Sequence, residues 1–172
     1  MVLLMANGLA GGEPISEGSE RADVFHQALE QVCIYLARCI AGDGEGATRL
    51  IEVTVSGAAS LSEARSAARA VVSSSLVKAA IHGADPNWGR VVAAVGRSGV
   101  EVEEAKLDLY IGEIPVVKAG RPLPFGKRSV IRLLEGKEVS LSLNLNLGSG
   151  KATAWGCDLS EEYVTINSQY MT

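Results

Sequence analysis

The sequence predicts an α+β protein in which sheets and helices form layers. Two patterns support this fold class. Apolar residues recur every three or four positions over residues 21–41, as in a helix, whereas apolar and polar side chains alternate strictly over residues 139–147, as in a strand. Helical patterns dominate residues 1–83 and strand patterns dominate residues 84–172, so we expect a helix-rich part followed by a strand-rich C-terminal subdomain.

Composition limits the class of protein further. Of the 172 residues, 47% are hydrophobic and 21% are charged, which is enough apolar material for a packed core. The net charge of −4 argues against a nucleic-acid-binding or anionic-membrane surface. Three scattered cysteines fit reduced thiols in a cytoplasmic protein better than a disulfide framework, and two distant histidines do not indicate a metal site.

The N-terminal elements are expected to be a strand, a helix and a second strand. Residues 1–6 form an apolar run typical of a buried strand. Residues 21–41 carry one apolar stripe and predict an amphipathic helix that ends at Gly42. Residues 48–56 alternate, so we expect a strand with one buried face and one partly exposed face.

A capping box marks the next helix. Ser60 is a suitable N-cap residue, and Glu63 follows it at the spacing that lets the two residues cap each other. The Ala-rich sequence after them predicts a helix to about residue 72, and residues 76–81 form a second helical turn or a bend.

Residues 85–90, Asp-Pro-Asn-Trp-Gly-Arg, have two interpretations. They form either a wall of a functional site or a rigid turn with Trp88 buried and Arg90 paired to a carboxylate. The structural interpretation is slightly favoured. The apolar residues 91–96 after this turn fit a strand or a short helix equally well.

The second half contains four candidate strands and one short helix. The candidate strands are residues 107–111, 114–118, 139–147 and 152–157. Gly148 to Gly150 predicts a hairpin between the last two strands. Residues 129–134 predict the helix.

Residues 42–49, Gly-Asp-Gly-Glu-Gly-Ala-Thr-Arg, stand out between a helix and a strand. Their glycines allow positive φ angles and close approach of another group. The order helix, glycine loop, strand is the reverse of a dinucleotide-binding turn. The stretch therefore predicts a loop that presents one carboxylate, Glu45, with a helix C-cap and turn as the simpler alternative.

Five sequence blocks, taken together, resemble one enzyme family. They are MVLLMANG at 1–8, DGEGATR at 43–49, ADPNWGR at 84–90, AWGCD at 154–158 and YVTIN at 163–167. In this order they closely resemble the ornithine acetyltransferases of arginine biosynthesis, also called bifunctional glutamate N-acetyltransferases. The resemblance covers the chain from end to end, and it implies the layered fold of a self-processing, N-terminal-nucleophile-like enzyme.

The resemblance implies an acyltransferase. Members of this family are made as one precursor that cuts itself at an Ala-Thr bond into an α and a β chain. The new N-terminal threonine takes an acetyl group from N²-acetylornithine and passes it to glutamate through an acetyl-threonine intermediate. The free α-amine of that threonine can act as its base. No cofactor or metal is expected, although some members also use acetyl-CoA as a co-substrate.

The chain departs from the family pattern in one respect. It lacks the cleavage block, and Ala47-Thr48 lies inside the glycine loop and is not that junction. We therefore expect the C-terminal part of a β chain, with no catalytic residue of its own and with the nucleophilic threonine upstream. It should be active only with the remaining β-chain segment and the α chain, as a cytoplasmic α2β2 assembly.

The resemblance also implies substrate-binding residues. Glu45 matches the β-chain glutamate that contacts substrate, and a carboxylate suits an ammonium group of ornithine. Asn167 and Thr172 match the C-terminal substrate-binding pair of the family. A frayed terminus is the simpler alternative, but Val164 and Ile166 favour a docked tail.

Two other functions remain open at this stage. An amidase or aminopeptidase of the same self-processing architecture would hydrolyse its acyl-enzyme with water and would not need a carboxylate placed for ornithine. A non-catalytic small-molecule-binding or assembly module would transfer no acetyl group at all. Glu45 together with Asn167 and Thr172 favours the transferase.

Overall fold

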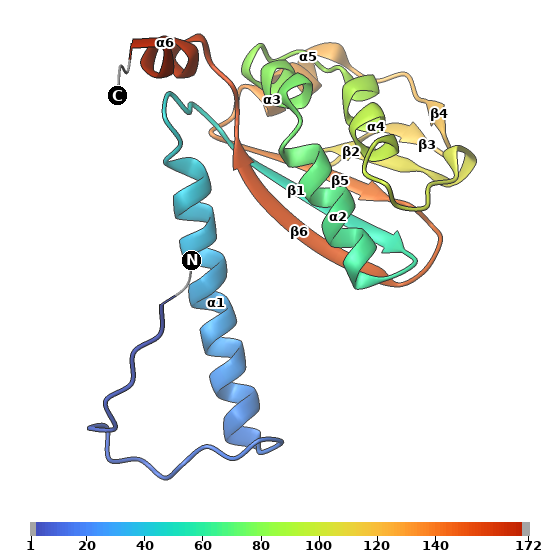
Figure 1. The fold of residues 1–172 in the computed structure, drawn as a ribbon. Coiled ribbons are helices and arrows are strands. Elements are labelled where there is room, and N and C mark those ends of the chain that lie inside the picture. Colours follow the sequence, from blue (N-terminus) through green and yellow to red (C-terminus); the bar gives the residue numbers. More distant parts are fainter. Residues whose placement is uncertain (1–2, 170–172) are drawn as a thin grey trace. The chain divides into compact units, whose positions relative to one another are not determined.

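A computed structural model describes residues 3–169 of the chain (Figure 1). Contacts within the chain divide it into two compact units, with the boundary after Leu36. The predicted boundary between residues 83 and 84 lies inside the second unit, where the helices on either side of it share one hydrophobic core.

The first unit consists of the segment before residue 20 and most of helix α1 (Glu20–Gly42), which confirms the predicted helix. Leu3 and Met5 are exposed and residues 3–6 form no strand, so the prediction of a buried strand is wrong for this segment. A strand is stable only when another strand takes up its backbone hydrogen bonds. Within the described part of the chain, residues 3–6 have no such partner.

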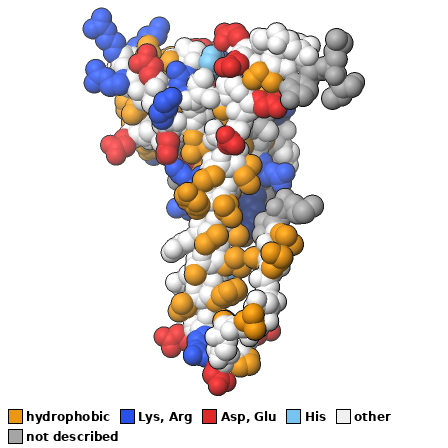
Figure 2. All heavy atoms as spheres, turned by 90° about the vertical axis from the view of Figure 1, so that its left-hand side faces the viewer, with side chains coloured by type: hydrophobic (Ala, Val, Ile, Leu, Met, Phe, Trp, Pro, Cys, Tyr) orange, Lys and Arg blue, Asp and Glu red, His pale blue; other side chains and the backbone are white. Residues whose placement is uncertain are grey.

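Helix α1 is amphipathic, yet none of its residues is buried. Its apolar stripe includes Val24, Phe25, Val32 and Leu36, each of which is more than half exposed. Figure 2 shows hydrophobic side chains along the length of this helix. Most of the stability of an amphipathic helix comes from burying its apolar face, so this face is suited to contact with another protein segment.

The second unit is built on a six-stranded mixed sheet with the order β4-β3-β2-β5-β1-β6. The strands are β1 (Leu50–Ala58), β2 (Asp108–Ile111), β3 (Ile114–Lys118), β4 (Arg121–Pro122), β5 (Glu138–Asn144) and β6 (Gly150–Cys157). β1 is parallel to β5 and antiparallel to β6. The α+β fold class and all of the predicted strands from residue 48 onwards are confirmed.

The predicted hairpin between β5 and β6 is wrong, because β1 lies between these two strands. The chain leaving β5 stays beside the end of β1: Leu145 N–H donates to Ser56 O, and Leu147 N–H donates to Gly57 O. It then passes around that end, and Gly150 pairs with Ala58 on the other side of β1. The glycines of residues 148–150 therefore serve a crossing around β1.

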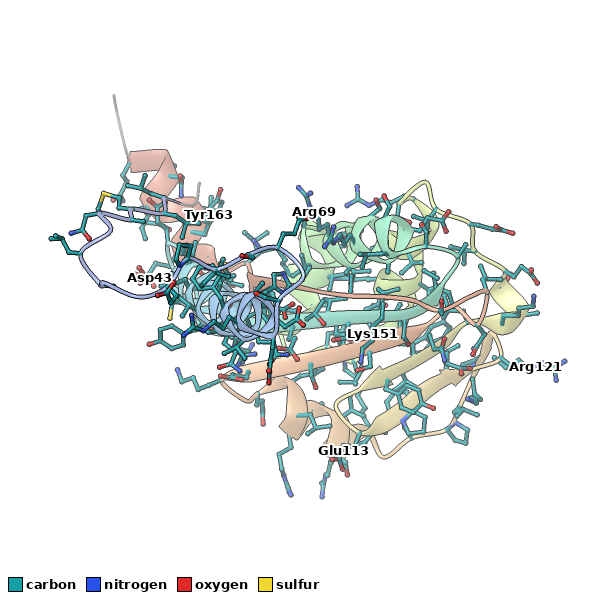
Figure 3. All side chains as sticks on the ribbon, turned by 90° about the horizontal axis from the view of Figure 1, so that it is seen from below. Asp43, Arg69, Glu113, Arg121, Lys151 and Tyr163 are labelled. Atoms are coloured by element: carbon teal, nitrogen blue, oxygen red, sulfur yellow. The ribbon has the colours of Figure 1, made fainter. Side chains whose placement is uncertain are left out.

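Three helices, α2 (Leu61–Val72), α3 (Ser75–His82) and α4 (Trp88–Gly96), cover one face of the sheet (Figures 1 and 3). The N–H of Glu63 donates to Ser60 Oγ at 3.2 Å, which confirms Ser60 as the N-cap of α2. Ile51, Val53 and Val55 of β1 are fully buried beneath these helices, while the alternate residues of β1 are half-buried. Both predicted faces of this strand are confirmed.

Residues 91–96 prove to be helical, as part of α4. Trp88 is half-buried against the core, but Arg90 has no carboxylate partner among the described residues. Its guanidinium donates to Leu76 O at 3.0 Å, so the predicted ion pair of Arg90 is wrong. A backbone carbonyl of α3 takes the place of the carboxylate, and Arg90 links α4 to α3.

The remaining helices are α5 (Lys127–Leu134), which confirms the predicted short helix, a 3-10 turn at Glu104–Lys106, and α6 (Glu161–Gln169). All three cysteines have free thiols. Across residues 3–169, no helix has both the length and the apolarity that crossing a bilayer requires.

Candidate functional site

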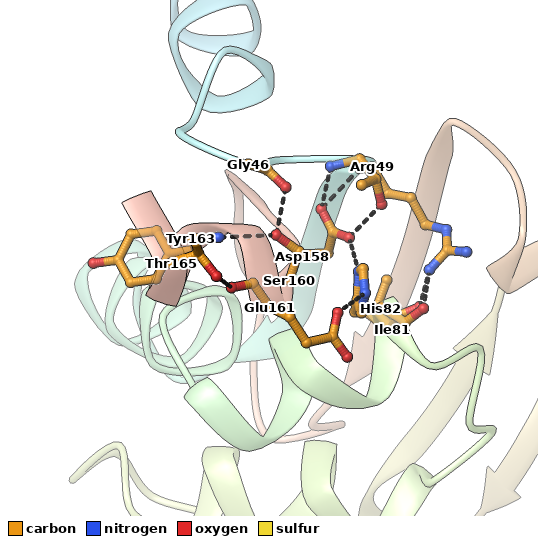
Figure 4. A network of polar contacts seen from close by, with 10 residues as sticks. Gly46, Arg49, Ile81, His82, Asp158, Ser160, Glu161, Tyr163 and Thr165 are labelled. Atoms are coloured by element: carbon orange, nitrogen blue, oxygen red, sulfur yellow. Dashed lines mark hydrogen bonds and ion pairs between the residues drawn. The ribbon is translucent and has the colours of Figure 1, made fainter. Parts of the chain in front are cut away.

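The candidate site is organised by Asp158, which follows β6 and whose side chain is fully buried (Figure 4). Its Oδ1 accepts hydrogen bonds from the backbone N–H groups of Thr48 and Arg49, at 2.8 and 2.9 Å. Its Oδ2 accepts from Thr48 Oγ1 at 2.5 Å and lies 2.7 Å from His82 Nδ1. One carboxylate thus holds the end of the glycine loop and the end of α3.

These hydrogen bonds keep Asp158 ionised. Burial acts to raise the pKa of Asp158, but hydrogen bonds from Thr48, His82 and Arg49 outweigh burial, so the pKa lies below its ordinary value. A carboxyl group with a lowered folded-state pKa contributes stability above its unfolded pKa and loses that contribution as the pH falls through the lower, folded value. The anchoring of the loop is therefore fully present at neutral pH.

Arg49 ties the same loop to the end of α3. Its Nη1 donates to Ile81 O at 2.6 Å and also to the carbonyl of His82. The carbonyls in the last turn of a helix have no partner within the helix, and a cation there is favoured by the helix dipole. Arg49 and Asp158 therefore hold the C-terminal end of α3 beside the loop.

His82 lies between two carboxylates. Its Nδ1 faces Asp158, and its Nε2 lies 3.1 Å from Oε2 of Glu161, the first residue of α6. The backbone N–H of Glu161 itself and then His82 hold the pKa of Glu161 below its ordinary value. The imidazole thus joins a buried anion to the start of the C-terminal helix.

Ser160 joins the start of α6 to the glycine loop directly. Its hydroxyl donates to Gly46 O at 2.6 Å and accepts from the N–H of Tyr163 at 3.2 Å. Gly46 has a φ of +67°, and a Cβ there would lie 2.7 Å from Tyr163 N and 2.8 Å from Ser160 Oγ. Only glycine satisfies both the backbone angle and the close approach.

The structure brings Glu45 and Asn167 together. The amide of Asn167 donates to Glu45 Oε2 at 2.8 Å and to Tyr163 O at 2.8 Å. Both side chains are exposed. Thr172 lies outside the described residues. Ile166 is half-buried, but Val164 is 59% exposed, so the expected docking of the tail through Val164 is wrong.

The pair keeps free hydrogen-bonding capacity. Among the described residues, nothing donates to Oε1 of Glu45 or to Oδ1 of Asn167. A carboxylate beside an amide oxygen makes an acceptor pair for an ammonium group, and the carboxylate supplies the charge. The part of Glu45 and Asn167 in substrate binding remains a prediction.

Sequence reasoning missed the residues that join the glycine loop, α3 and the start of α6, namely His82, Asp158, Ser160 and Glu161. Asp158 ends the AWGCD block, and Ser160 followed by two glutamates is typical of a helix start, so two signals were present. The partners of Asp158 lie 76 to 110 residues away in sequence, a separation at which no local pattern identifies them.

The ArgJ family model matches residues 1–172. This chain belongs to the ArgJ family. It is 52% identical over 172 residues to the arginine biosynthesis bifunctional protein ArgJ of Symbiobacterium thermophilum, covering 100% of this chain and 43% of that protein. It is 50% identical over 171 residues to that of Dehalococcoides mccartyi, covering 99% of this chain and 42% of that protein. The chain thus spans less than half the length of these ArgJ relatives.

A solved structure agrees with the fold. The crystal structure of the arginine biosynthesis bifunctional protein ArgJ from Bacillus halodurans is 46% identical and superposes with a TM-score of 0.95. The match covers 99% of this chain and 80% of that one. The family resemblance and the layered α+β architecture are therefore confirmed.

Proposed function

We propose that this chain is part of a glutamate N-acetyltransferase of arginine biosynthesis. The observation that carries the proposal is the match of the ArgJ family model to residues 1–172, together with relatives named as arginine biosynthesis bifunctional proteins. In the reaction, a threonine outside this chain attacks the acetyl carbonyl of N²-acetylornithine and ornithine leaves. The amine of glutamate then attacks the acetyl-threonine ester and restores the hydroxyl.

The proposed role of this chain is to bind the amino-acid part of both substrates. Glu45 takes up an ammonium group of ornithine through a charge-assisted hydrogen bond, and Asn167 orients Glu45 and adds an acceptor. Their hydrogen bond supports this proposal, because residues far apart in sequence meet with unused acceptors. Thr172 is proposed as a third substrate ligand. No cofactor is proposed; some members of the family also use acetyl-CoA as a co-substrate.

The proposed partners are the remaining β-chain segment and the α chain of one precursor, in a cytoplasmic α2β2 assembly that alone is active. The exposed apolar face of α1 supports this part of the proposal. Covering such a face removes apolar side chains from water, at about 25 cal/mol per Å². Other segments of the same protein are the proposed cover.

The test is acetyl transfer from N²-acetylornithine to glutamate by this chain produced together with the proposed remaining β-chain segment and α chain. Replacing Glu45 by Ala should lower kcat/KM about 10- to 100-fold, as expected for the loss of a hydrogen bond to a charged group. The matched control is Glu113→Ala. Glu113 is an exposed glutamate in the turn between β2 and β3 (Figure 3), and its removal should leave transfer unchanged.

Other outcomes would redirect the assignment. Release of acetate from N²-acetylornithine without transfer to glutamate would indicate the hydrolase. An assembled complex that performs neither reaction would indicate a binding module. Full transfer activity in the Glu45→Ala variant would remove the proposed role of Glu45.

A further inference from the structure

We propose that His82 is a positioning residue that sets the direction of α6 and thereby keeps Asn167 against Glu45. This inference rests on the proposed function, because it concerns the residues proposed to bind substrate. His82 touches neither Glu45 nor Asn167; it acts through Asp158 and Glu161.

Helix α6 depends on polar contacts for its placement. None of its residues is buried, and both Tyr163 and Val164 are substantially exposed. Apolar packing therefore contributes little to holding this helix against the rest of the second unit. Within residues 3–169, the side-chain hydrogen bonds that join the start and length of α6 to other elements are Ser160 with Gly46, His82 with Glu161, and Asn167 with Glu45.

These contacts have different mechanical roles. The Ser160–Gly46 hydrogen bond fixes the point where the chain enters α6. A single fixed point leaves the helix free to tilt about it. The contact between His82 and Glu161 adds a second point on the first turn, and the two together define a direction.

His82 can serve as a fixed point because it is itself held. Its Nδ1 lies against Asp158, which three donors from Thr48 and Arg49 hold in place, and its backbone carbonyl accepts from Arg49. The Glu161 side chain, by contrast, is 92% exposed, and His82 is its one side-chain partner among the described residues. The constraint thus runs from the buried carboxylate to the imidazole and on to α6.

Loss of this constraint should displace Asn167. Asn167 lies six residues beyond Glu161, a distance of about 9 Å along an α-helix. A tilt of about 10° would move it by about 1.5 Å, which is enough to break a hydrogen bond of ordinary length. Glu45 would then lose the amide that orients it, and substrate would bind less tightly.

The experiment uses steady-state acetyl transfer by the complete assembled protein. Replacing Glu161 by Ala should raise KM for N²-acetylornithine and for glutamate about tenfold and change kcat less than threefold, as expected for the loss of substrate orientation. The matched control is Glu162→Ala: Glu162 is the adjacent exposed glutamate, has no recorded side-chain partner among the described residues, and should keep the KM values of the unmodified protein.

His82→Asn separates positioning from support of the core. The Asn amide can occupy the place of Nδ1 and still donate to Asp158, but it cannot reach Glu161. This variant should therefore keep its unfolding midpoint while its KM values rise as in Glu161→Ala. Combining the two substitutions should add nothing further, because both remove the same contact.

Three results would overturn the inference. Unchanged KM values in Glu161→Ala would do so, and the proposed function would stand if Glu45→Ala still impaired transfer. Additive effects of His82→Asn and Glu161→Ala would show that the two residues act separately. A lower kcat together with a lower unfolding midpoint in His82→Asn would identify a merely structural histidine. Full transfer activity in Glu45→Ala would instead remove the proposed role of Glu45 in substrate binding, on which this inference rests.

Discussion

Two carboxylates are associated with the glycine loop, and they differ in burial and in hydrogen bonding: Asp158 binds its last residues, Thr48 and Arg49, whereas Glu45 lies in its middle. Asp158 is buried, and its oxygens are taken up by Thr48, Arg49 and His82. Glu45 is exposed and, among the residues that the structure describes, accepts one hydrogen bond, from Asn167. An anion whose partners all belong to the protein cannot take a ligand, whereas one with free acceptor positions can.

The difference follows from solvation. Placing a charge in the interior is costly unless hydrogen bonds replace the lost water, so Asp158 can exist only with a complete set of donors. Glu45 is exposed and solvated by water, which an ammonium group could replace. The loop therefore combines a rigid end at Thr48 and Arg49, where the protein supplies the partners, with an open middle at Glu45, where a substrate would supply them.

The largest expected effect is at the rigid end. Asp158→Ala would leave two backbone N–H groups, a hydroxyl and an imidazole without their acceptor. We expect a loss of about 3–5 kcal/mol in the free energy of unfolding, measured by urea denaturation of the assembled protein. A loss below about 1 kcal/mol would mean that water replaces the carboxylate and that Asp158 is not a buried anchor.

A smaller effect is expected at Gly46, between the open middle and the rigid end of the loop. In Gly46→Ala, the positive φ alone should cost about 1–2 kcal/mol, and the new methyl group would press on Tyr163 N and Ser160 Oγ. The matched control is Gly42→Ala, because a methyl group there meets its nearest neighbour at 4.0 Å. In this helical position alanine should stabilise the protein by about 0.5–1 kcal/mol. Two changes of the same sign in the measured unfolding free energy would contradict the described loop conformation.

The smallest effect on stability is expected at Glu45, in the open middle of the loop. Glu45→Gln keeps an acceptor for Asn167 and removes only an exposed charge, so the free energy of unfolding should change by less than about 0.5 kcal/mol. The same urea measurement checks this value. A destabilisation comparable to that of Asp158→Ala would end the distinction between the two carboxylates and make Glu45 a structural residue as well.

Local patterns predicted local structure well. Ser60 caps α2 as expected, and the alternation that starts at Val139 is a strand. The order of strands was not predictable in the same way: Gly148 to Gly150 is typical of a hairpin, yet these residues take the chain around β1. Turn composition indicates that the chain reverses, but the choice of neighbouring strand depends on the whole sheet.

In the candidate site, too, some residues were predictable from the sequence and others were not. Glu45 and Asn167 were indicated by their family blocks, and their contact agrees with that assignment without testing it. His82 carried no signal beyond being one of two scattered histidines. His82 lies at the end of α3 and contacts Asp158 and Glu161, which are 76 and 79 residues further along the chain. Local sequence patterns cannot indicate contacts over that separation.

The interior position of β1, between β5 and β6, also affects folding during translation. β1 leaves the ribosome before α2, yet its neighbours in the sheet are β5 and β6, and Leu50 pairs with both Glu138 and Cys157. A nascent chain therefore carries an apolar strand with two unpaired edges while most of the unit is translated. Chaperone protection is needed most during that interval, and a truncation before β6 would leave a β1 edge open to aggregation.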